Sequence, residues 1–368
     1  MLTADMPQQK KERTIELVDF IHKNGGTTER LKPLAGDCSN RKYYRLYAQK
    51  NCFAQSVIVM ETSNIEEMNR FIKTAQLLHQ KNLRVPEIYA SSPKGFALLE
   101  DFGDQTYKNA LNAQDNPKQR DSLWTEMLDI LRDLQEKTKC AQKKPANDME
   151  DTVPLLSNDI LMREVDIFLE WGLSFQGQSM SAADKKEAEA LWTKFLAPLK
   201  IEDATVLTLR DFHTENIMRL KPQGDKASNS PNSSGEKAAH YGLLDFQDAV
   251  LGHPSYDLVS LIEDVRLPFN PKQAEMLRKS FANNQKIFSP DIFDEPYAIL
   301  SLQRATKIFG IFCRLALQYS NYKMLEYLPN ICFIIDERLK RLGKCALTDF
   351  FQTLDLKKRL DALVPSKA

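Results

Sequence analysis

The sequence predicts an α+β fold with a small, β-rich N-terminal lobe and a larger, mainly helical C-terminal lobe. Three observations lead to this prediction. The first part of the chain alternates short β-like runs with helical segments, and helical periodicity dominates from about residue 105 onward. The 368 residues, 42% of them hydrophobic, are also enough for two lobes with their own cores. We therefore divide the chain into a lobe over residues 1–101 and a lobe over residues 102–368.

The N-terminal lobe is predicted from apolar periodicity and turn residues. Residues 14–24 form an amphipathic helix that ends before Gly25 and Gly26. Three strands follow, with a turn over 38–42 between the first two, then a helix and two more strands. This order is typical of a small α+β lobe. The strands are expected at 30–36, 42–48, 55–62, 85–91 and 95–102, and the helix at 64–82.

The C-terminal lobe is predicted from longer helical periods. Its first helices are expected over 121–138, 158–172 and 182–199, with a polar connector at 143–154. After residue 255 the pattern is helical almost to the end, where 349–368 reads as one further amphipathic helix. The segment 221–240 is rich in Ser, Asn, Gly and Pro, which predicts a flexible surface loop.

Charge and cysteine usage exclude several classes of protein. The 50 basic and 50 acidic residues cancel, so no net positive charge indicates nucleic acid or a membrane surface as partner. Neither a secretory signal nor a membrane-spanning run is recognisable. The six cysteines are scattered without a CxxC pair, which is typical of thiols in a reducing compartment. We expect a cytoplasmic monomer that acts on a small molecule.

Two polar stretches between apolar runs carry the chemistry. In "TLRDFHTENIM" (208–218), Asp211 and Asn216 are five positions apart, and in "YGLLDFQDA" (241–249) Asp245 follows two leucines. Phosphoryl transfer needs one carboxylate to orient the attacking hydroxyl and accept its proton. It also needs an amide oxygen and a second carboxylate to hold Mg²⁺ on the nucleotide phosphates. Asp-x4-Asn followed by such an Asp is the spacing of a kinase catalytic loop. A loop carboxylate without a catalytic role is the alternative reading of Asp211.

The two stretches together resemble the aminoglycoside phosphotransferase family, which is related to choline and protein kinases. The resemblance covers roughly residues 15–340. Other segments, among them "SNRKYYRL", "LLEDFGDQTY" and "LMREVDIFLEW", look like a bacterial branch of that family. That branch phosphorylates N-acetylmuramate and N-acetylglucosamine at the anomeric hydroxyl in cell-wall recycling. The matching motif residues are Asp211, His213, Asn216, Asp245, Phe246, Ala249, Gly252, Asp257 and Leu258.

The resemblance implies a bilobal protein-kinase-like fold and a role for each motif residue. Asp211 would be the catalytic base, with His213 in the catalytic loop beside it, and Asn216 and Asp245 would bind Mg²⁺. Asp257 would be structural and brace the catalytic loop from the start of a helix. The backbone of Leu99, Glu100 and Asp101 would meet the base of ATP or of another nucleoside triphosphate. His213 could equally be a loop histidine whose hydrogen bonds are satisfied and that only positions the Asp. For Asp257 the alternative interpretation is a helix cap.

This sequence departs from the family pattern at two positions. Leu209 stands where a histidine is usual, and Met60 lies near the usual place of a phosphate-binding lysine on the third strand. Arg41, Lys42 or Arg45 could supply the positive charge instead. Gly36 and Ser39 could let backbone amides approach a phosphate.

Residues that would bind the acceptor are predicted with alternatives. We name Arg163, Glu164, Trp171, Asp248 and Arg304 as candidates, because a sugar site needs hydroxyl acceptors and a ring to stack on. A surface charge pattern explains Arg163 and Glu164 about as well. The series 304, 307 and 314 is either a solvated stripe or the lining for an anionic lactyl group or phosphate.

The predicted reaction is transfer of the γ-phosphoryl of ATP, with Mg²⁺, to a sugar hydroxyl. The favoured acceptor is the anomeric hydroxyl of N-acetylmuramate or N-acetylglucosamine. A kinase of another alcohol, such as an amino alcohol or an aminoglycoside, is the nearest alternative. A nucleotide-binding pseudokinase that acts as a partner protein is the alternative from another class, since Leu209 and the missing lysine would fit it.

Overall fold

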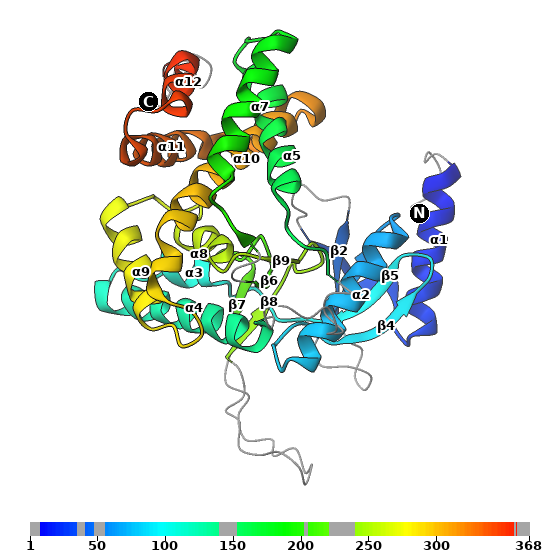
Figure 1. The fold of residues 1–368 in the computed structure, drawn as a ribbon. Coiled ribbons are helices and arrows are strands. Elements are labelled where there is room, and N and C mark those ends of the chain that lie inside the picture. The colour runs from blue at the N-terminus through cyan, green and yellow to red at the C-terminus, as the bar shows by residue number, and fades with distance from the viewer. Residues whose placement is uncertain are drawn as a thin grey trace. The chain divides into compact units, whose positions relative to one another are not determined.

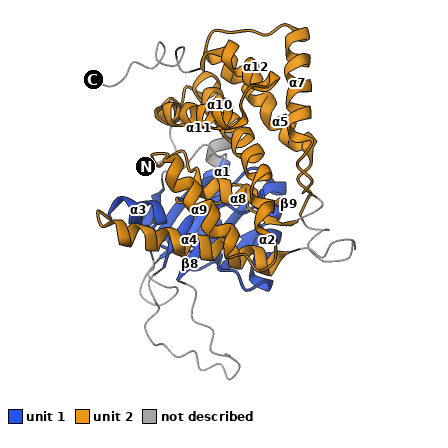
Figure 2. Ribbon diagram, turned by 60° about the vertical axis from the view of Figure 1, so that its left-hand side comes forward, with its two compact units in different colours: residues 1–113, 215–248 blue, residues 114–214, 249–368 orange. Residues whose placement is uncertain are grey.

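The fold is that of a computed structural model, which describes residues 8–34, 41–47, 56–139, 153–201, 205–220, 240–356 and 358. The chain divides into two compact units, one of residues 1–113 and 215–248 and the other of residues 114–214 and 249–368 (Figure 2). The domain boundary predicted after residue 101 stays a prediction. Ser39, Gly36, residues 143–152 of the predicted connector and residues 221–239 of the predicted loop lie outside the described residues.

The first unit contains a five-stranded antiparallel sheet in the order β1-β2-β3-β5-β4 (Figure 1). All five predicted strands are present: β1 (Leu31–Pro33), β2 (Lys42–Tyr47), β3 (Ser56–Glu61), β4 (Ile88–Ser92) and β5 (Phe96–Glu100). The register places Tyr43 of β2 opposite Met60 of β3, and Met60 opposite Ala97 of β5. Since side chains alternate along a strand, each strand contributes to two different faces.

Helices supply the apolar partners of this sheet. Leu17, Phe20 and Ile21 of α1 (Gln8–Lys23) join Val57 and Val59 of β3 in one buried cluster. The helix begins at Gln8, before the predicted residue 14. The second helix, α2 (Ile65–Gln80), starts at Asn64, whose side chain caps the helix by accepting a hydrogen bond from the amide of Glu67. The alternate β3 side chain Ile58 faces the cavity described below.

A short hairpin completes the first unit. Strands β7 (Ile217–Arg219) and β8 (Tyr241–Leu243) pair antiparallel, with Ile217 opposite Leu243. The amide of Leu244 donates to the carbonyl of Asn216 at 2.9 Å, which extends the ladder by one step. The residues at this end of the hairpin are therefore held side by side although 28 positions of sequence separate Asn216 from Leu244. Helix α3 (Tyr107–Asn112) lies beside the hairpin and contacts β7.

The second unit is mainly helical, as predicted. Its buried cluster combines residues of several helices around the long helix α10, among them Phe168, Trp192, Phe309 and Phe351. Strands β6 (Val206–Thr208) and β9 (Val250–Gly252) form its two-stranded sheet. The helices are α4 (Pro117–Thr138), α5 (Asn158–Ile167), α6 (Leu173–Phe175), α7 (Ala182–Leu196), α8 (Ser255–Ile262), α9 (Pro271–Asn283), α10 (Glu295–Tyr319), α11 (Leu328–Leu342) and α12 (Ala346–Leu354).

Two predicted helices differ from those observed. The helix expected over 158–172 ends as an α-helix at Ile167 and continues as a π-turn over Phe168–Gly172. At this turn α10 packs closely, because a Cβ at Gly310 would lie 2.6 Å from the backbone Cα and N of Phe168. The tail helix expected over 349–368 begins earlier, at Ala346, and is interrupted after Leu354 by Asp355, which has a left-handed φ of 46°. Leu356 and Lys358 are again helical, and residues 357 and 359–368 lie outside the described residues.

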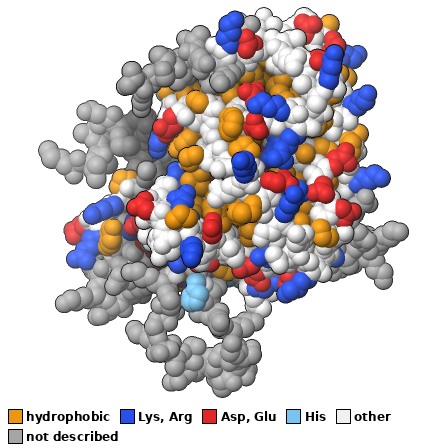
Figure 3. Space-filling view, turned by 90° about the vertical axis from the view of Figure 1, so that its left-hand side faces the viewer, with side chains coloured by type: hydrophobic (Ala, Val, Ile, Leu, Met, Phe, Trp, Pro, Cys, Tyr) orange, Lys and Arg blue, Asp and Glu red, His pale blue; other side chains and the backbone are white. Residues whose placement is uncertain are grey.

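The surface carries charges of both signs. On the face shown in Figure 3, acidic and basic side chains are interspersed with apolar ones. Among the described helices, none combines the length and the apolar character that crossing a membrane would require. Cys313, Cys332 and Cys345 are free thiols, and the first two are buried. The other three cysteines lie outside the described residues.

Candidate functional site

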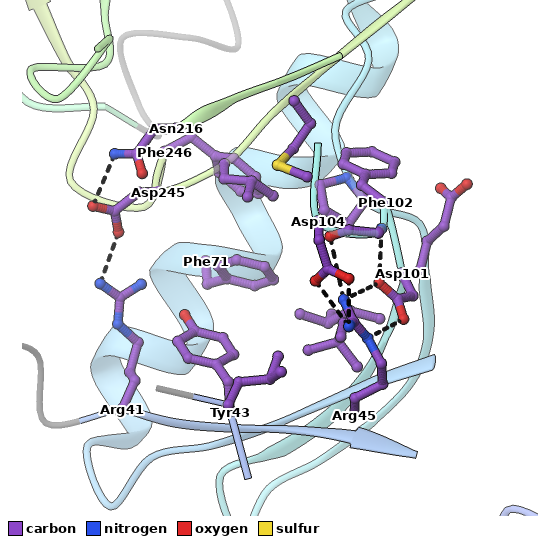
Figure 4. A pocket seen from close by; sticks show the side chains of 18 residues that line it. Arg41, Tyr43, Arg45, Phe71, Asp101, Phe102, Asp104, Asn216, Asp245 and Phe246 are labelled. Atoms are coloured by element: carbon purple, nitrogen blue, oxygen red, sulfur yellow. Dashed lines mark hydrogen bonds and ion pairs between the residues drawn. The ribbon is translucent and has the colours of Figure 1, made fainter. Parts of the chain in front are cut away.

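A cavity of about 300 Å³ lies within the first unit (Figure 4). Side chains of β2, of α2, of the end of β5 and of the β7–β8 hairpin meet around it. Polar groups gather at two ends, and Tyr43 and Phe71 lie between them (Figure 4). The aromatic ring of Phe71 stacks on Phe246 at a centroid distance of 4.9 Å. The labelled lining residues are Arg41, Tyr43, Arg45, Phe71, Asp101, Phe102, Asp104, Asn216, Asp245 and Phe246.

Strand alternation decides which cations reach the cavity. Arg41, Tyr43 and Arg45 have the same parity and line it. Lys42 has the opposite parity: its side chain is 66% exposed and its Nζ lies 3.8 Å from Glu61 Oε1. Of the three cations proposed as replacements for the missing lysine, Arg41 and Arg45 are therefore placed at the cavity.

One end of the cavity is built around Arg45 and Asp101. Arg45 Nε donates to Asp101 Oδ2 at 2.6 Å and Arg45 Nη2 donates to Asp101 Oδ1 at 3.0 Å. Ser56 Oγ donates to the same carboxylate at 2.6 Å. Burial would raise the pKa of Asp101, but these hydrogen bonds and the Arg45 charge hold that pKa below its usual range. The segment predicted to meet the nucleotide base lies at this end: Leu99, Glu100 and Asp101 all line the cavity.

The other end is built around Asp245. Asn216 Nδ2 lies 3.5 Å from Asp245 Oδ2, and Arg41 Nη2 donates to Asp245 Oδ1 at 2.8 Å (Figure 4). Gln247 Nε2 donates to the same oxygen at 2.9 Å. Asp245 has φ 57°, in the left-handed region where non-glycine residues are uncommon and often functional. The two predicted metal ligands are thus neighbours, while the nearby Asp248 is exposed and lies 3.9 Å from Arg70.

In the second unit, Asp211 is surrounded by cations. Arg304 Nη2 lies 3.4 Å from Asp211 Oδ1. Desolvation would raise the pKa of Asp211, but Lys307, Arg304, His213 and Arg210 together lower it to about 2. Arg304 itself is only 5% exposed, so the solvated-stripe reading of this residue is wrong. The surrounding positive charge therefore keeps the Asp211 carboxylate ionised.

Glu164 ties the other cations together. Its carboxylate pairs with Arg210, and its Oε1 lies 2.8 Å from Lys307 Nζ. Gln303 Nε2 donates to its Oε2 at 2.9 Å. Burial opposes ionisation of Glu164, but Lys307 and Arg210 hold its pKa below the usual range. Because Glu164 is buried, the surface-charge reading does not apply to it. Its predicted role as a sugar ligand stays a prediction.

Asp257 holds the backbone of the predicted catalytic loop. Its two carboxylate oxygens accept from the amides of Leu209 at 2.7 Å and Arg210 at 2.9 Å. Ser260 Oγ donates to the carbonyl of Arg210 at 2.9 Å. Arg210 has φ 70°, which is strained for a residue of its size, so these bonds stabilise an unfavourable turn. Burial raises the pKa of Asp257 to about 7 despite the two amide donors.

The remaining predicted residues are placed less specifically. His213 is buried, and burial together with Arg266 lowers its pKa. Its neighbour Thr214 donates through Oγ1 to Asp264 at 2.6 Å. Arg163 is exposed on α5, whereas Trp171 is half-buried and packs against the main cluster of the second unit.

Sequence reasoning missed several residues of these arrangements. Glu67, Phe71, Gln247 and Asp264 were not predicted. Glu67 and Gln247 contact predicted residues, Phe71 lines the cavity, and Asp264 accepts from Thr214, the neighbour of His213. The alternation of β2 is a signal that could have identified Tyr43 and separated Arg41 from Lys42. Nothing in the sequence pairs Glu67 of α2 with Arg41, because that contact arises only in the folded unit.

Comparison with known proteins places these arrangements in context. Residues 30–287 match the model of the phosphotransferase enzyme family. An N-acetylmuramate/N-acetylglucosamine kinase of Caulobacter vibrioides is 28% identical over 88% of this chain and 92% of its own. A protein of the same name from Pseudomonas putida is 27% identical over 86% of this chain and 85% of its own.

Solved structures show the same fold. The Plasmodium vivax ethanolamine kinase Pv091845 superposes with a TM-score of 0.56 at 10% identity, over 92% of this chain and 98% of its own. A microcompartment-associated aminopropanol kinase superposes with a TM-score of 0.51 at 12% identity, over 89% of this chain and 98% of its own. At such identities the likeness concerns the fold alone.

Proposed function

Since the chain belongs to the phosphotransferase enzyme family and is a kinase with an alcohol acceptor, we propose that it phosphorylates an amino sugar. The donor is ATP with Mg²⁺, and the acceptor is the anomeric hydroxyl of N-acetylmuramate or N-acetylglucosamine. The product is a sugar 1-phosphate, and cell-wall recycling in the cytoplasm is the proposed setting. The observation that carries the acceptor is the name shared by relatives that align over most of this chain.

The residues at the Asp245 end of the cavity fit a magnesium ion. Mg²⁺ takes few protein oxygens and keeps several waters, so one amide and one carboxylate suffice. Asn216 and Asp245 offer that pair as neighbours on one hairpin. Mg²⁺ bound there would neutralise charge on the phosphates of the nucleotide. The aromatic walls Phe71 and Phe246 and the polar Arg45–Asp101 end fit a base and ribose.

Asp211 is the proposed general base. Its carboxylate stays ionised because of the surrounding cations, so it can orient the sugar hydroxyl and accept its proton. The anomeric hydroxyl is more acidic than an ordinary alcohol, so a carboxylate base is chemically adequate. Asp211 and Asn216 lie on one loop between β6 and β7, five positions apart, and the chain thereby links the proposed base to a proposed metal ligand.

The function is tested by a coupled ADP-release assay with ATP, Mg²⁺ and a panel of acceptors. The panel contains N-acetylmuramate, N-acetylglucosamine, glucose, choline, kanamycin and a blank. We expect turnover with the two N-acetylated sugars only, and a product phosphate that is stable to alkali and labile to acid. Turnover with a different acceptor would rule out the sugar as the substrate but would leave the assignment as a kinase in place. Nucleotide binding without turnover on any acceptor would favour a pseudokinase.

A further inference from the structure

Arg41 lies between two carboxylates at the Asp245 end of the cavity. Its Nη2 is 2.8 Å from Asp245 Oδ1, and its Nε is 3.2 Å from Glu67 Oε1. The side chain is 8% exposed, so this guanidinium is held in place instead of moving freely in solvent. Figure 4 shows it pointing toward Asp245 and Asn216 and away from the Arg45–Asp101 end.

The charge balance of the cavity gives Arg41 its significance. The described lining carries four carboxylates, those of Glu100, Asp101, Asp104 and Asp245, and two cations, Arg41 and Arg45. A polyphosphate entering this cavity therefore needs cations to offset the repulsion. Arg45 is committed to Asp101 and to Asp104, at 2.8 Å from Asp104 Oδ1, at the opposite end. On the third strand, Met60 is fully buried and uncharged.

We propose that Arg41 is the cation that binds the nucleotide phosphates in this protein, and that Glu67 of α2 is its positioning residue. The proposal rests on the proposed function, because it assigns a role within the same nucleotide site. The guanidinium supplies planar paired donors, which match phosphate oxygens better than a single ammonium group does. Glu67 Oε1 lies 3.2 Å from Nε, whereas Nη2 reaches Asp245 at the cavity.

The shared contact with Asp245 couples Arg41 to the metal site. In this structure Arg41 neutralises the Asp245 carboxylate. If Asp245 held Mg²⁺, the guanidinium would lose that partner and would be available to the phosphates, with Glu67 Oε1 still beside its Nε. Arg41 would thus keep the Asp245 carboxylate paired before nucleotide and metal bind.

The test compares two ligands that differ only in phosphate content. Dissociation constants are measured for adenosine and for the non-hydrolysable ATP analogue AMPPNP, both in saturating Mg²⁺, by calorimetry on the full chain. Arg41→Gln should weaken AMPPNP binding roughly tenfold or more, as expected for loss of a charge-assisted contact. Adenosine binding should stay within about twofold, since adenosine has no phosphate to meet Arg41. Glu67→Gln should produce a smaller loss of the same kind. The double variant should be no weaker than Arg41→Gln, because Glu67 acts through Arg41.

Lys42→Gln is the matched control. It removes the adjacent cation, which faces the other side of β2, and both affinities should match the wild type. Arg41→Lys should recover part of the AMPPNP affinity. If Arg41→Gln fails to fold, Arg41→Lys and Glu67→Gln test the role of Arg41 in its place.

Three results would overturn the assignment. Wild-type affinity for both AMPPNP and adenosine in Arg41→Gln and Arg41→Lys would remove Arg41 from the phosphate site. Equal weakening of both ligands would make Arg41 merely structural. If the wild-type protein binds neither ligand, the proposed nucleotide function itself is wrong. If the wild type binds both ligands and the variants bind them equally well, only the role assigned to Arg41 is wrong.

Discussion

Arg304 of α10 and Asp211 of the β6–β7 loop form a partly buried ion pair, with Arg304 Nη2 3.4 Å from Asp211 Oδ1. The Arg304 side chain is 6% exposed and that of Asp211 is 45% exposed. One side of the carboxylate is therefore fixed by a buried cation, and the other side is open to an approaching group. This exposed side is compatible with the proposed role of Asp211 as general base.

Asp211→Asn should abolish turnover while leaving the fold intact. The amide keeps the shape of the side chain but cannot accept a proton, so kcat should fall by roughly 10²- to 10⁴-fold. The measurement is kcat under saturating substrates, with the thermal midpoint of unfolding as a check on structure. Glu215→Gln makes the same chemical change four residues later, at a carboxylate paired with Lys108, and should leave kcat nearly unchanged. Near-normal turnover in Asp211→Asn would exclude Asp211 as the base.

The pH dependence of turnover should reflect the cations around Asp211. With a pKa of about 2, Asp211 stays ionised above pH 4, so kcat should show no titration of this group between pH 4 and 8. In Arg304→Gln the pKa of Asp211 should rise, so kcat should begin to fall at the acidic end of the measured pH range. The lowered pKa of Asp211 also makes the stability of the fold depend on pH. The pair stabilises the fold above the unfolded-state pKa of Asp, and this contribution is lost as the pH falls toward 2.

Arg314→Gln is the control for that experiment, because Arg314 lies on the same helix but not in the Asp211 cluster. A fall in kcat at acidic pH that appears equally in both variants would contradict the electrostatic explanation.

Asp257→Asn should loosen the strained turn at Arg210. The amide offers one acceptor oxygen where the carboxylate serves two backbone donors, so unfolding free energy should fall by about 1–3 kcal/mol. Since folding raises the pKa of Asp257 to about 7, the wild type has a contribution to stability that is present below pH 4 and lost as the pH rises through 7. This slope should be absent in the variant. Denaturant unfolding at pH 4, 6 and 8 measures it, and parallel curves for the two proteins would refute the assignment of that pKa.

Asp245→Asn should remove the metal dependence of nucleotide binding. A neutral amide is a weaker ligand for a hard cation, so added Mg²⁺ should no longer improve AMPPNP affinity. Adenosine binding, which needs no metal, is the internal control. If Mg²⁺ still tightens AMPPNP binding as it does in the wild type, Asp245 is not a ligand.

Glu164→Gln separates a structural role from a sugar contact. The change leaves Arg210 and Lys307 facing a neutral group in a buried site, which should cost about 3 kcal/mol of stability. Glu170→Gln, at an exposed residue two turns along, should cost almost nothing. A stable Glu164→Gln protein with a strongly raised KM for the sugar alone would instead support the predicted contact.

The elements that follow from local pattern were predictable. The five strands of the first unit and the helices α2, α4, α7 and α10 rest on alternation, helical periodicity and capping residues such as Asn64, all of which are local. The π-turn at Phe168 and the end of α12 were not predicted. The first coincides with the close packing of Gly310, and the second rests on the backbone conformation of Asp355.

The site was predictable as a motif but not as a network. Asp211, Asn216 and Asp245 were selected by spacing and by resemblance. The partners Glu164 of Arg210 and Glu67 of Arg41 come from helices 46 and 26 positions away, and no local rule pairs them. The same limit left Arg304 and Lys307 open as a solvated stripe, since their burial depends on carboxylates from other elements.

The alternation of β2 has a consequence for changes in chain length. Arg41 and Arg45 share a face only because four positions, an even number, separate them. Deleting one residue between them would send one arginine to the apolar side under α1, whereas deleting two would restore the shared facing at the cost of a shorter strand. Indel variants of this strand should therefore fall into odd and even classes. The odd class should lose one end of the cavity entirely, a defect that no single substitution at these positions would reproduce.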